Sequence, residues 1–511
     1  MIEYKNVDGY DLQNIKPSKV IQTDVLVVGA GNAGMMAAAA AKEHGAQVVL
    51  IEKEKTINLM RVGIASVSSN AQKRAGTVIN KTDLVESLAA FAQHNVDEKL
   101  LKTWADNSSE SVNWLEDNIL KPHGAHFRSE PDAMVTSKAY QGFPTENDPT
   151  IDDQSFVSYG DWFVDYQKKH GVEIRYQTAL VGLHKSQDVV SSAIVKDLKT
   201  NEFYEIVAKK GIILATGGYS ANKSLLSKWD PLALKKNTYN DSPRSNGAGI
   251  TAALNVGAIK DEEPAESIFD RGLVPVGTKT EDMYYQTATY DNWLWIGSYP
   301  FLKVNLKGER FSNESVPYQF IVNAASKEPG YLYAMIWDDQ YGQVLEKMHM
   351  LGCARYGFPG YMKDKEAFIA DTENYVNKGL VVKADSVEEL ADKLNLPLAA
   401  VNKSIAANNQ AVIANEDCEF GKESYRITPI KKPPFYGCIL GGRILCTLDG
   451  LRVNSKMEVL DKNHDPIKHL YAGGNDSGGF FWGSYNDRVP GLASSHAQTF
   501  GRLAGINAAK N

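Results

Sequence analysis

The stretch TDVLVVGAGNAGMMAAAAAKEHGAQVVLIEKEK, residues 23–55, decides how the chain folds. An apolar run at 25–28 is followed by a glycine-rich turn and an alanine-rich segment. A second segment at 47–51, QVVLI, is apolar from residue 48 and ends at Glu52. Apolar runs of this length beside a long alanine-rich segment predict a strand, a helix and a second strand.

The glycines of the turn have the pattern G-x-G-x-x-G at Gly29, Gly31 and Gly34. The first allows a tight turn, the second lets backbone approach a pyrophosphate at the helix N-terminus, and the third lets helix and strand pack closely. Glu52 can accept hydrogen bonds from ribose hydroxyls, which favours an unphosphorylated ribose. The order of these features predicts a dinucleotide-binding unit for FAD or NAD.

The composition narrows the class of protein. The chain has 511 residues with 55 basic and 62 acidic side chains, a net charge of −7 and no basic field that would attract nucleic acid. With 43% hydrophobic residues it is long enough for a large core and two domains. Nucleic acid is therefore not an expected partner.

The cysteines and the N-terminal segment predict a cytoplasmic protein. Cys353, Cys418, Cys438 and Cys446 are scattered without the spacing of a zinc, iron–sulfur or covalent haem site, so no metal is expected. The N-terminal segment lacks an apolar core, and no long apolar run predicts membrane insertion. A reducing compartment fits this cysteine usage.

Two later segments resemble the end of the first strand. GIILATGGYSAN at 211–222 and HLYAGGNDSGG at 469–479 each place glycines and small polar residues after an apolar run. Ligands of α/β sheets bind at the carboxyl ends of strands. Three such ends from distant parts of the chain predict one long cofactor.

The motifs VVGAGNAG, ATGGYSAN, NGAGITAALNVGA, KGERFSNE and LYAGGNDSGG occur in an order that resembles one flavoprotein family. That family contains the fumarate reductase flavoprotein subunits, urocanate reductase and the 3-ketosteroid dehydrogenases, and the resemblance runs from Thr23 to Ala509. It implies an α/β fold with a discontinuous Rossmann-like FAD-binding domain, residues 20–262 and 436–511. An α+β substrate-capping domain, residues 263–435, is inserted between the two parts and is called the cap below. Within the cap, Ser386 three residues before Glu389 predicts a helix N-terminus.

The resemblance also implies the cofactor contacts. Carried over to the matching positions, they are Gly29, Gly31, Asn32, Ala33, Gly34, Glu52, Lys53, Arg61, Ala65, Ser66, Ala215, Thr216, Gly217, Gly218, Asn246, Gly247, Gly249, Gly474, Asn475, Gly491 and Leu492. Covalent members of the family attach the flavin to a histidine near the loop 59–73, which here contains none. The FAD is therefore expected to be non-covalent.

The fumarate reductases of this family take the substrate proton from an arginine eight residues after the arginine of their RF-x-NE motif. Here Arg310 begins that motif, and Tyr318 stands at the acid position. A histidine that holds a substrate carboxylate in those enzymes is replaced by Cys446. Fumarate or succinate is therefore not the expected substrate.

The 3-ketosteroid dehydrogenases match better at these positions. Their cap has a Pro-Tyr pair after the same motif, as in Pro317-Tyr318 here, and a second tyrosine that corresponds to Tyr485. The resemblance implies that Tyr318 transfers the proton, and that Tyr485 with a backbone N–H near Gly491 binds the ketone oxygen. Arg488 matches the remaining clamp arginine of fumarate reductases, in a loop two residues longer than in the dehydrogenases.

Arg488 leaves the substrate open, because a guanidinium can bind a carboxylate, polarise a carbonyl or pair with a phenolate. Arg488 can instead be a surface arginine at a helix N-terminus without a role in catalysis. Tyr485 can likewise be a packing residue. The aromatic segment 284–301 and the residues Phe480–Trp482 can line a pocket for a flat substrate or form ordinary core.

Three functions therefore stay possible at this point. The first is an FAD-dependent oxidoreductase that reduces or forms a C=C bond conjugated to a carbonyl in a cyclic enone, steroid or polyphenol, including isoflavonoid reductases like tetrahydrodaidzein reductase. The second is a reductase of an α,β-unsaturated monocarboxylate of the urocanate or cinnamate type, with Arg488 on the acid. The third is a non-catalytic flavoprotein. In the reductive direction the electrons would come from NADH or a separate redox carrier.

Overall fold

The computed structural model describes residues 9–58, 63–130, 139–280, 292–348, 350, 354–358, 362 and 364–511. The predicted cofactor contact Arg61 and residues 284–291 of the aromatic segment 284–301 lie outside these residues.

The larger sheet carries the predicted βαβ unit at its centre. Its strands are β16 (Glu458–Leu460), β17 (Pro466–Ala472), β8 (Val189–Asp197), β9 (Phe203–Leu214), β1 (Val20–Val28), β2 (Val48–Ile51) and β6 (Glu173–Arg175), with β7 (Thr178–Ser186) paired to β8. β1 is parallel to β2 on one side and to β9 on the other, and β9 is parallel to β17. The three segments predicted to bind one cofactor therefore end side by side at one edge of the sheet.

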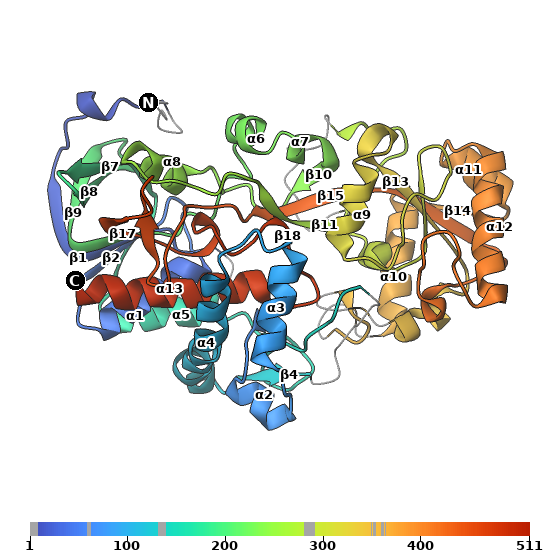
Figure 1. The fold of residues 1–511 in the computed structure, drawn as a ribbon, viewed down its shortest axis with the longest axis horizontal. Coiled ribbons are helices and arrows are strands. Elements are labelled where there is room, and N and C mark those ends of the chain that lie inside the picture. Colours follow the sequence, from blue (N-terminus) through green and yellow to red (C-terminus); the bar gives the residue numbers. More distant parts are fainter. Residues whose placement is uncertain are drawn as a thin grey trace.

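Two helices far apart in the sequence pack on this sheet as a pair. α1 (Asn32–Glu43) follows β1, and α13 (Leu492–Lys510) lies beside it (Figure 1). A Cβ atom added to Gly501 would lie 2.2 Å from the carbonyl oxygen of Ala33, and one added to Gly505 would lie 2.2 Å from that of Ala37. The missing side chains let the two helix backbones approach more closely than ordinary packing allows.

The second sheet belongs mainly to the cap. Its strands are β12 (Leu302–Asn305), β13 (Tyr333–Asp338), β15 (Phe435–Thr447), β11 (Ala265–Val274) and β18 (Gly483–Ser484), with β10 (Asn237–Asn240) and β14 (Val381–Ala384) also paired to β15. β15 runs from the end of the cap that α11 and α12 cover to the middle of the molecule (Figure 1). It pairs with β10 and β11 near its end and with β13 and β14 near its start, so it joins the two parts of the fold.

The remaining elements cover these sheets. A small sheet contains β3 (Ile64–Ala65), β5 (Glu146–Thr150) and β4 (His126–Ser129). The other α-helices are α2 (Asn70–Ala75), α3 (Lys81–Phe91), α4 (Glu98–Leu115), α5 (Gly160–Lys169), α6 (Lys223–Trp229), α7 (Ala233–Lys236), α8 (Ala248–Asn255), α9 (Tyr318–Ala325), α10 (Lys365–Asn377), α11 (Val387–Lys393) and α12 (Leu398–Ala414). The predicted helix start in the cap is confirmed, since Ser386 accepts a hydrogen bond from the Glu389 N–H and caps α11. The exact domain boundaries stay a prediction.

None of the helices in the described ranges combines the length and the apolar character needed to cross a bilayer.

Replacing Gly505 with alanine tests the packing of α1 on α13. The new methyl group would collide with the backbone of Ala37, so we expect the free energy of unfolding to fall by about 1–3 kcal/mol. Thermal or urea unfolding measures this change. Lys510→Ala, at an exposed position of the same helix, is the control, and equal stability of both variants would contradict the close packing.

Candidate active site

The glycine turn between β1 and α1 has the geometry that a dinucleotide requires. Gly29 has φ +101°, and a Cβ there would lie 2.3 Å from the carbonyl oxygen of Ala215. A Cβ on Gly34 would lie 1.8 Å from the carbonyl oxygen of Gly29. Gly31 differs, because it begins α1 without a side-chain cap and a Cβ there would meet no atom within 4 Å. The N-terminus of α1 therefore faces open space that suits the pyrophosphate of FAD.

Glu52 lies at the end of β2, where its carboxylate is fixed by backbone groups. One oxygen accepts a hydrogen bond from the Ala30 N–H at 2.8 Å, and the other accepts from the Glu54 N–H at 3.0 Å. Each carboxylate oxygen can accept a further bond. The residue predicted to hold the ribose is thus oriented before any ligand arrives.

Asp476 joins two of the predicted cofactor-binding turns. One carboxylate oxygen accepts hydrogen bonds from the Thr216 N–H at 2.5 Å and the Thr216 hydroxyl at 2.7 Å. The other accepts from the Gly218 N–H at 3.0 Å. Asp476 is fully buried; desolvation raises its pKa, and the bonds from Gly218 and Thr216 oppose that effect. It was not among the predicted site residues, although the GND sequence after a strand was a usable signal.

The predicted contacts of the second and third strand ends lie together around this aspartate. The Thr216 hydroxyl accepts a bond from the Gly249 N–H at 3.1 Å, which brings the start of α8 to the same place. Positive φ angles occur at the predicted glycines Gly217, Gly218, Gly247, Gly474 and Gly491. Asn246 begins the turn into α8, and Asn475 lies against Gly218.

Other predicted cofactor contacts gather at the N-terminus of α13. The Ala65 N–H donates to the Gly491 carbonyl oxygen at 3.0 Å. Ala65 and the adjacent Ser66 therefore lie next to Gly491 and Leu492. Asn32 donates to the Ser494 hydroxyl at 3.1 Å. Lys53 lies elsewhere and donates to the Arg244 carbonyl oxygen. Apart from Lys53, these residues lie where α1, α13 and β3 meet.

Tyr485 uses its hydroxyl within its own loop. The hydroxyl donates to the Val489 carbonyl oxygen at 3.3 Å and accepts from the Leu492 N–H at 3.1 Å. The ring is buried, and desolvation raises the pKa of Tyr485 far above its ordinary value. In this arrangement Tyr485 shapes the loop before α13, and its role in binding a ketone oxygen stays a prediction.

Tyr318 and Arg488 lie on two segments that contact each other. Tyr318 is the first residue of α9, and its N–H donates to the Asp487 carboxylate at 3.0 Å. Arg488 Nη2 donates to the Ser315 carbonyl oxygen at 3.0 Å, and Nη1 lies 3.6 Å from Asp487. Arg488 is only 3% exposed, which excludes the surface-arginine interpretation, and its Nε has no hydrogen-bond partner among the described residues.

Gln319 holds the same two segments together from inside. Its side-chain oxygen accepts bonds from the Ile268 N–H and the Tyr485 N–H, both at 3.2 Å. Its side-chain nitrogen donates to the Gly483 carbonyl oxygen at 3.4 Å. Gln319 and Asp487 were missed in the sequence because their roles depend on contacts between distant segments.

An aromatic wall, defined as Phe269, Trp293 and Trp295, lies beside Tyr318. The rings of Phe269 and Tyr318 are 5.1 Å apart, and those of Phe269 and Trp293 are 5.0 Å apart. The Arg271 guanidinium lies 4.6 to 5.4 Å from the three rings of the wall, at cation–π distance.

Phe480 and Phe481 occupy a different setting from this wall. Both pack against His496 of α13, and Phe480 also contacts Phe500 and Trp104. Trp482 donates its indole N–H to Glu263. For Phe480 and Phe481 these contacts favour the core interpretation over the pocket interpretation.

Arg355 of the cap binds three carboxylates of the other part of the fold. Its donors lie 3.0 Å from Glu130, 2.8 Å from Glu146 and 2.9 Å from Asp148. The backbone of Glu146 pairs with Ala65, so the cluster lies beside a predicted flavin-contacting loop. Burial and the negative charge of Asp148 raise the pKa of Glu146 to about 8 although Arg355 opposes the shift.

Comparison with known proteins decides the family. The family model described as FAD binding domain matches residues 24–487. The chain belongs to the FAD-binding domain family. As a member of this family it is an FAD-dependent oxidoreductase that acts on CH–CH groups, and the predicted α/β Rossmann-like fold with an inserted cap is confirmed.

Individual members of the FAD-binding domain family extend the comparison. The chain is 28% identical to the vinyl phenol reductase of Lactiplantibacillus plantarum over 95% of this chain and 96% of that protein. It is 27% identical to the probable fumarate reductase Ifc3 of Shewanella frigidimarina over 99% of this chain and 78% of that protein. In fold it resembles the 3-ketosteroid-Δ4-(5α)-dehydrogenase of Rhodococcus jostii, with a TM-score of 0.72 and 20% identity over 98% of this chain and 99% of that one.

Asp476→Asn tests whether the buried carboxylate organises the FAD site. The amide would present its NH₂ or a single oxygen to donors that now share two carboxylate oxygens, and one lost bond to a charged group costs about 1.5–3 kcal/mol. We expect the Kd for FAD to rise roughly 10- to 100-fold, measured by flavin fluorescence titration. Asp465→Asn, at an exposed position, is the control. An unchanged Kd in Asp476→Asn would rule out this role.

Glu146→Gln tests the charge balance at the Arg355 cluster. Because the pKa of folded Glu146 lies near 8, above its ordinary 4.5, the folded protein binds this proton more tightly than the unfolded chain. The resulting stabilisation is complete below pH 4.5 and is lost as the pH rises towards about 8. We expect Tm of the FAD-loaded protein to fall more steeply over this range in the wild type than in Glu146→Gln. Equal slopes would show that Glu146 does not carry this proton.

Proposed function

We propose that the enzyme reduces a C=C bond that is conjugated, through a planar ring, to a phenolic or ketonic oxygen. The observation that carries this proposal is the placement of Tyr318 beside the aromatic wall. Tyr318 stands at the sequence position where fumarate reductases of the family have the arginine that donates the proton. The similarity to a vinyl phenol reductase over nearly the full length of both chains supports the same substrate class.

The residues around Tyr318 suit a flat ring better than a short dicarboxylate. Phe269 and Trp293 can stack on an aromatic or alicyclic ring and exclude water from it. Cys446 stands where the fumarate reductases have a histidine for the substrate carboxylate, and a thiol supplies no positive charge there.

Bound FAD supplies the hydride for this chemistry. Tyr318 holds the proton on its phenol oxygen and delivers it as a positioned general acid. Arg488 places a buried positive charge close by, where it can pair with an oxygen that carries negative charge in the substrate or the transition state. Asp487 accepts a hydrogen bond from the backbone N–H of Tyr318 and also lies beside the Arg488 side chain. It therefore holds Tyr318 and Arg488 close to each other.

The cofactor is proposed to be non-covalent. The loop 59–73 contains no histidine that could attach to the flavin. Precipitation with acid should therefore release all the flavin into the supernatant, and flavin that stays with the protein pellet would disprove this point.

A second candidate substrate is an α,β-unsaturated monocarboxylate such as a cinnamate. It is favoured by the buried Arg488, whose Nε has no partner among the described residues and suits one oxygen of a carboxylate. The two candidates differ in where the conjugated oxygen lies, on the ring or on the acid.

An anaerobic reoxidation screen separates the candidates. The FAD-loaded protein is reduced with dithionite and mixed with 4-vinylphenol, a 4-ene-3-ketosteroid, an isoflavone, cinnamate or fumarate, and flavin absorbance is followed. Fast reoxidation by a ring phenol or enone supports the proposal, and reoxidation by cinnamate alone supports the second candidate. Reoxidation by fumarate alone, or by none of them faster than by buffer, would overturn both. In a separate experiment, the oxidised FAD-loaded protein is mixed with NADH in place of dithionite, and bleaching of the flavin absorbance tests NADH as the electron donor.

Tyr318→Phe removes only the proposed proton donor. We expect the substrate-dependent reoxidation rate to fall about 10²- to 10⁴-fold, because a positioned acid contributes that much to proton transfer. The FAD absorbance and the Kd for FAD should not change. Tyr10→Phe, which removes a hydroxyl that binds Lys196 far from the cofactor turns, serves as the control. A near-normal rate in Tyr318→Phe would remove Tyr318 from the mechanism.

A further inference from the structure

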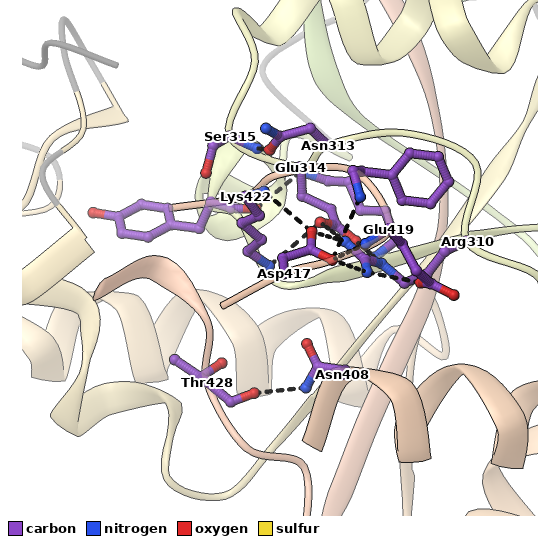
Figure 2. A network of polar contacts seen from close by, with 12 residues as sticks. Arg310, Asn313, Glu314, Ser315, Asn408, Asp417, Glu419, Lys422 and Thr428 are labelled. Atoms are coloured by element: carbon purple, nitrogen blue, oxygen red, sulfur yellow. Dashed lines mark hydrogen bonds and ion pairs between the residues drawn. The ribbon is translucent and has the colours of Figure 1, made fainter. Parts of the chain in front are cut away.

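A buried ionic network lies in the cap behind the candidate active site. We define the cap ionic network as Arg310, Glu314, Asp417 and Lys422, with Glu419 at its exposed edge (Figure 2). Arg310 binds two carboxylates through two forks. Its Nε and Nη2 each lie 3.0 Å from Glu314, and its Nη1 and Nη2 lie 3.0 and 2.9 Å from Asp417.

The network fixes a loop of the cap to the segment that precedes Tyr318. Asp417 also accepts backbone N–H bonds from Glu419 and Lys422, both at 3.1 Å, so it closes the loop 417–422. Lys422 Nζ forms an ion pair with the Glu314 carboxylate at 3.4 Å. Burial raises the pKa of Asp417, but the bonds from Arg310 and the loop outweigh it and hold the pKa below its ordinary value. The carboxylate is therefore charged when it holds Arg310.

Glu314 connects this network to the residues that face the substrate. The carbonyl oxygen of the next residue, Ser315, accepts a hydrogen bond from Arg488. Tyr318 follows three residues later, and its N–H donates to Asp487. The segment 314–318 is thus held on one side by Arg310 and on the other by the loop before α13. The side chains of Arg310 and Glu314 are 5% and 0% exposed, so water does not screen the attraction between them.

The same glutamate also reaches the aromatic wall. The Lys303 N–H donates to Glu314 at 3.4 Å, and Lys303 Nζ lies 3.6 Å from Asp270. Asp270 precedes Arg271 and follows Phe269 on β11. Glu314 is therefore linked through Lys303 to the strand that carries Phe269 of the aromatic wall.

Buried ion pairs are poor stabilisers, because desolvation cancels much of their attraction, so the bidentate geometry around Arg310 favours a role in positioning over one in stability. We infer that Arg310 and Glu314 are positioning residues that set Tyr318 and Arg488 at the distance the reaction needs. This inference rests on the proposed function of Tyr318.

A double-mutant cycle tests the inference with 4-vinylphenol, or the fastest acceptor of the screen, as the probe. Arg310→Lys keeps the charge but loses both forks. We expect it to slow reoxidation of the pre-reduced enzyme by the probe about 10- to 100-fold, because small misplacements of a catalytic group cost that much. In the Tyr318→Phe background the same change should have little further effect, since the group it positions is already absent.

A second readout does not depend on turnover. We expect amide hydrogen exchange in peptides covering 314–325 to be faster in Arg310→Lys, because the Tyr318 N–H loses its fixed contact with Asp487. Arg502→Lys is the matched control, since Arg502 is a buried arginine of α13 that binds Glu110 of α4 and Glu43 of α1. It should change neither the exchange in 314–325 nor the reaction with the probe. If Arg310→Lys does not fold, Asp417→Asn removes one fork partner at constant size and is expected to give the same two results.

An equal slowing by Arg310→Lys in the wild-type and Tyr318→Phe backgrounds would overturn the inference, as would unchanged exchange in 314–325. Failure of the proposed function looks different. In that case Tyr318→Phe alone reacts at a near-normal rate, while the exchange result still reports whether the network positions the segment.

Discussion

The carboxylate of Asp476 is the contact on which the cofactor site depends. Three strands from distant parts of the chain end at one edge of the sheet. Asp476 binds the turn after β9 through Thr216 and Gly218 while it lies in the turn after β17. Since Thr216 in turn binds the start of α8, one buried side chain orders three of the segments that match the family's FAD-binding motifs.

The candidate substrate site depends on contacts across the boundary between the cap and the remainder of the fold. Gln319 and Asp487 hold the start of α9 against the loop that carries Tyr485 and Arg488. Arg355 adds a second, strongly charged contact beside the small sheet. Neither part contains the proposed chemistry alone, because Tyr318 comes from the cap and Arg488 from the segment before α13.

The local features were predictable from the sequence because their causes are local. The glycine turn, α1, β2 and Glu52 follow one another within thirty residues, and the Ser386 cap is decided by its neighbour Glu389. The sequence offered a signal for Asp476, but the partners of Asp476, Gln319 and Arg355 were not predictable, because each lies more than a hundred residues away. The bonds of the Tyr485 hydroxyl within its own loop and the packing of Phe480 on α13 also needed the structure, since the sequence does not show which way these side chains turn.

The contact of α1 with α13 has a consequence for how the protein is made. The glycines of α13 complete the packing of a helix that lies more than 450 residues earlier, as the bond from Asn32 to Ser494 shows. During synthesis on the ribosome, β1, β2 and β9 therefore leave the exit tunnel long before β17 and α13 can cover them. The cap emerges in between, but β15, which pairs with β11, β13 and β14, follows it in the chain. The predicted FAD contacts Gly491 and Leu492 lie at the start of α13, so we expect FAD to bind only after α13 has been made. Chains that stop upstream of α13 would lack this part of the predicted cradle, however much of the cap they contain.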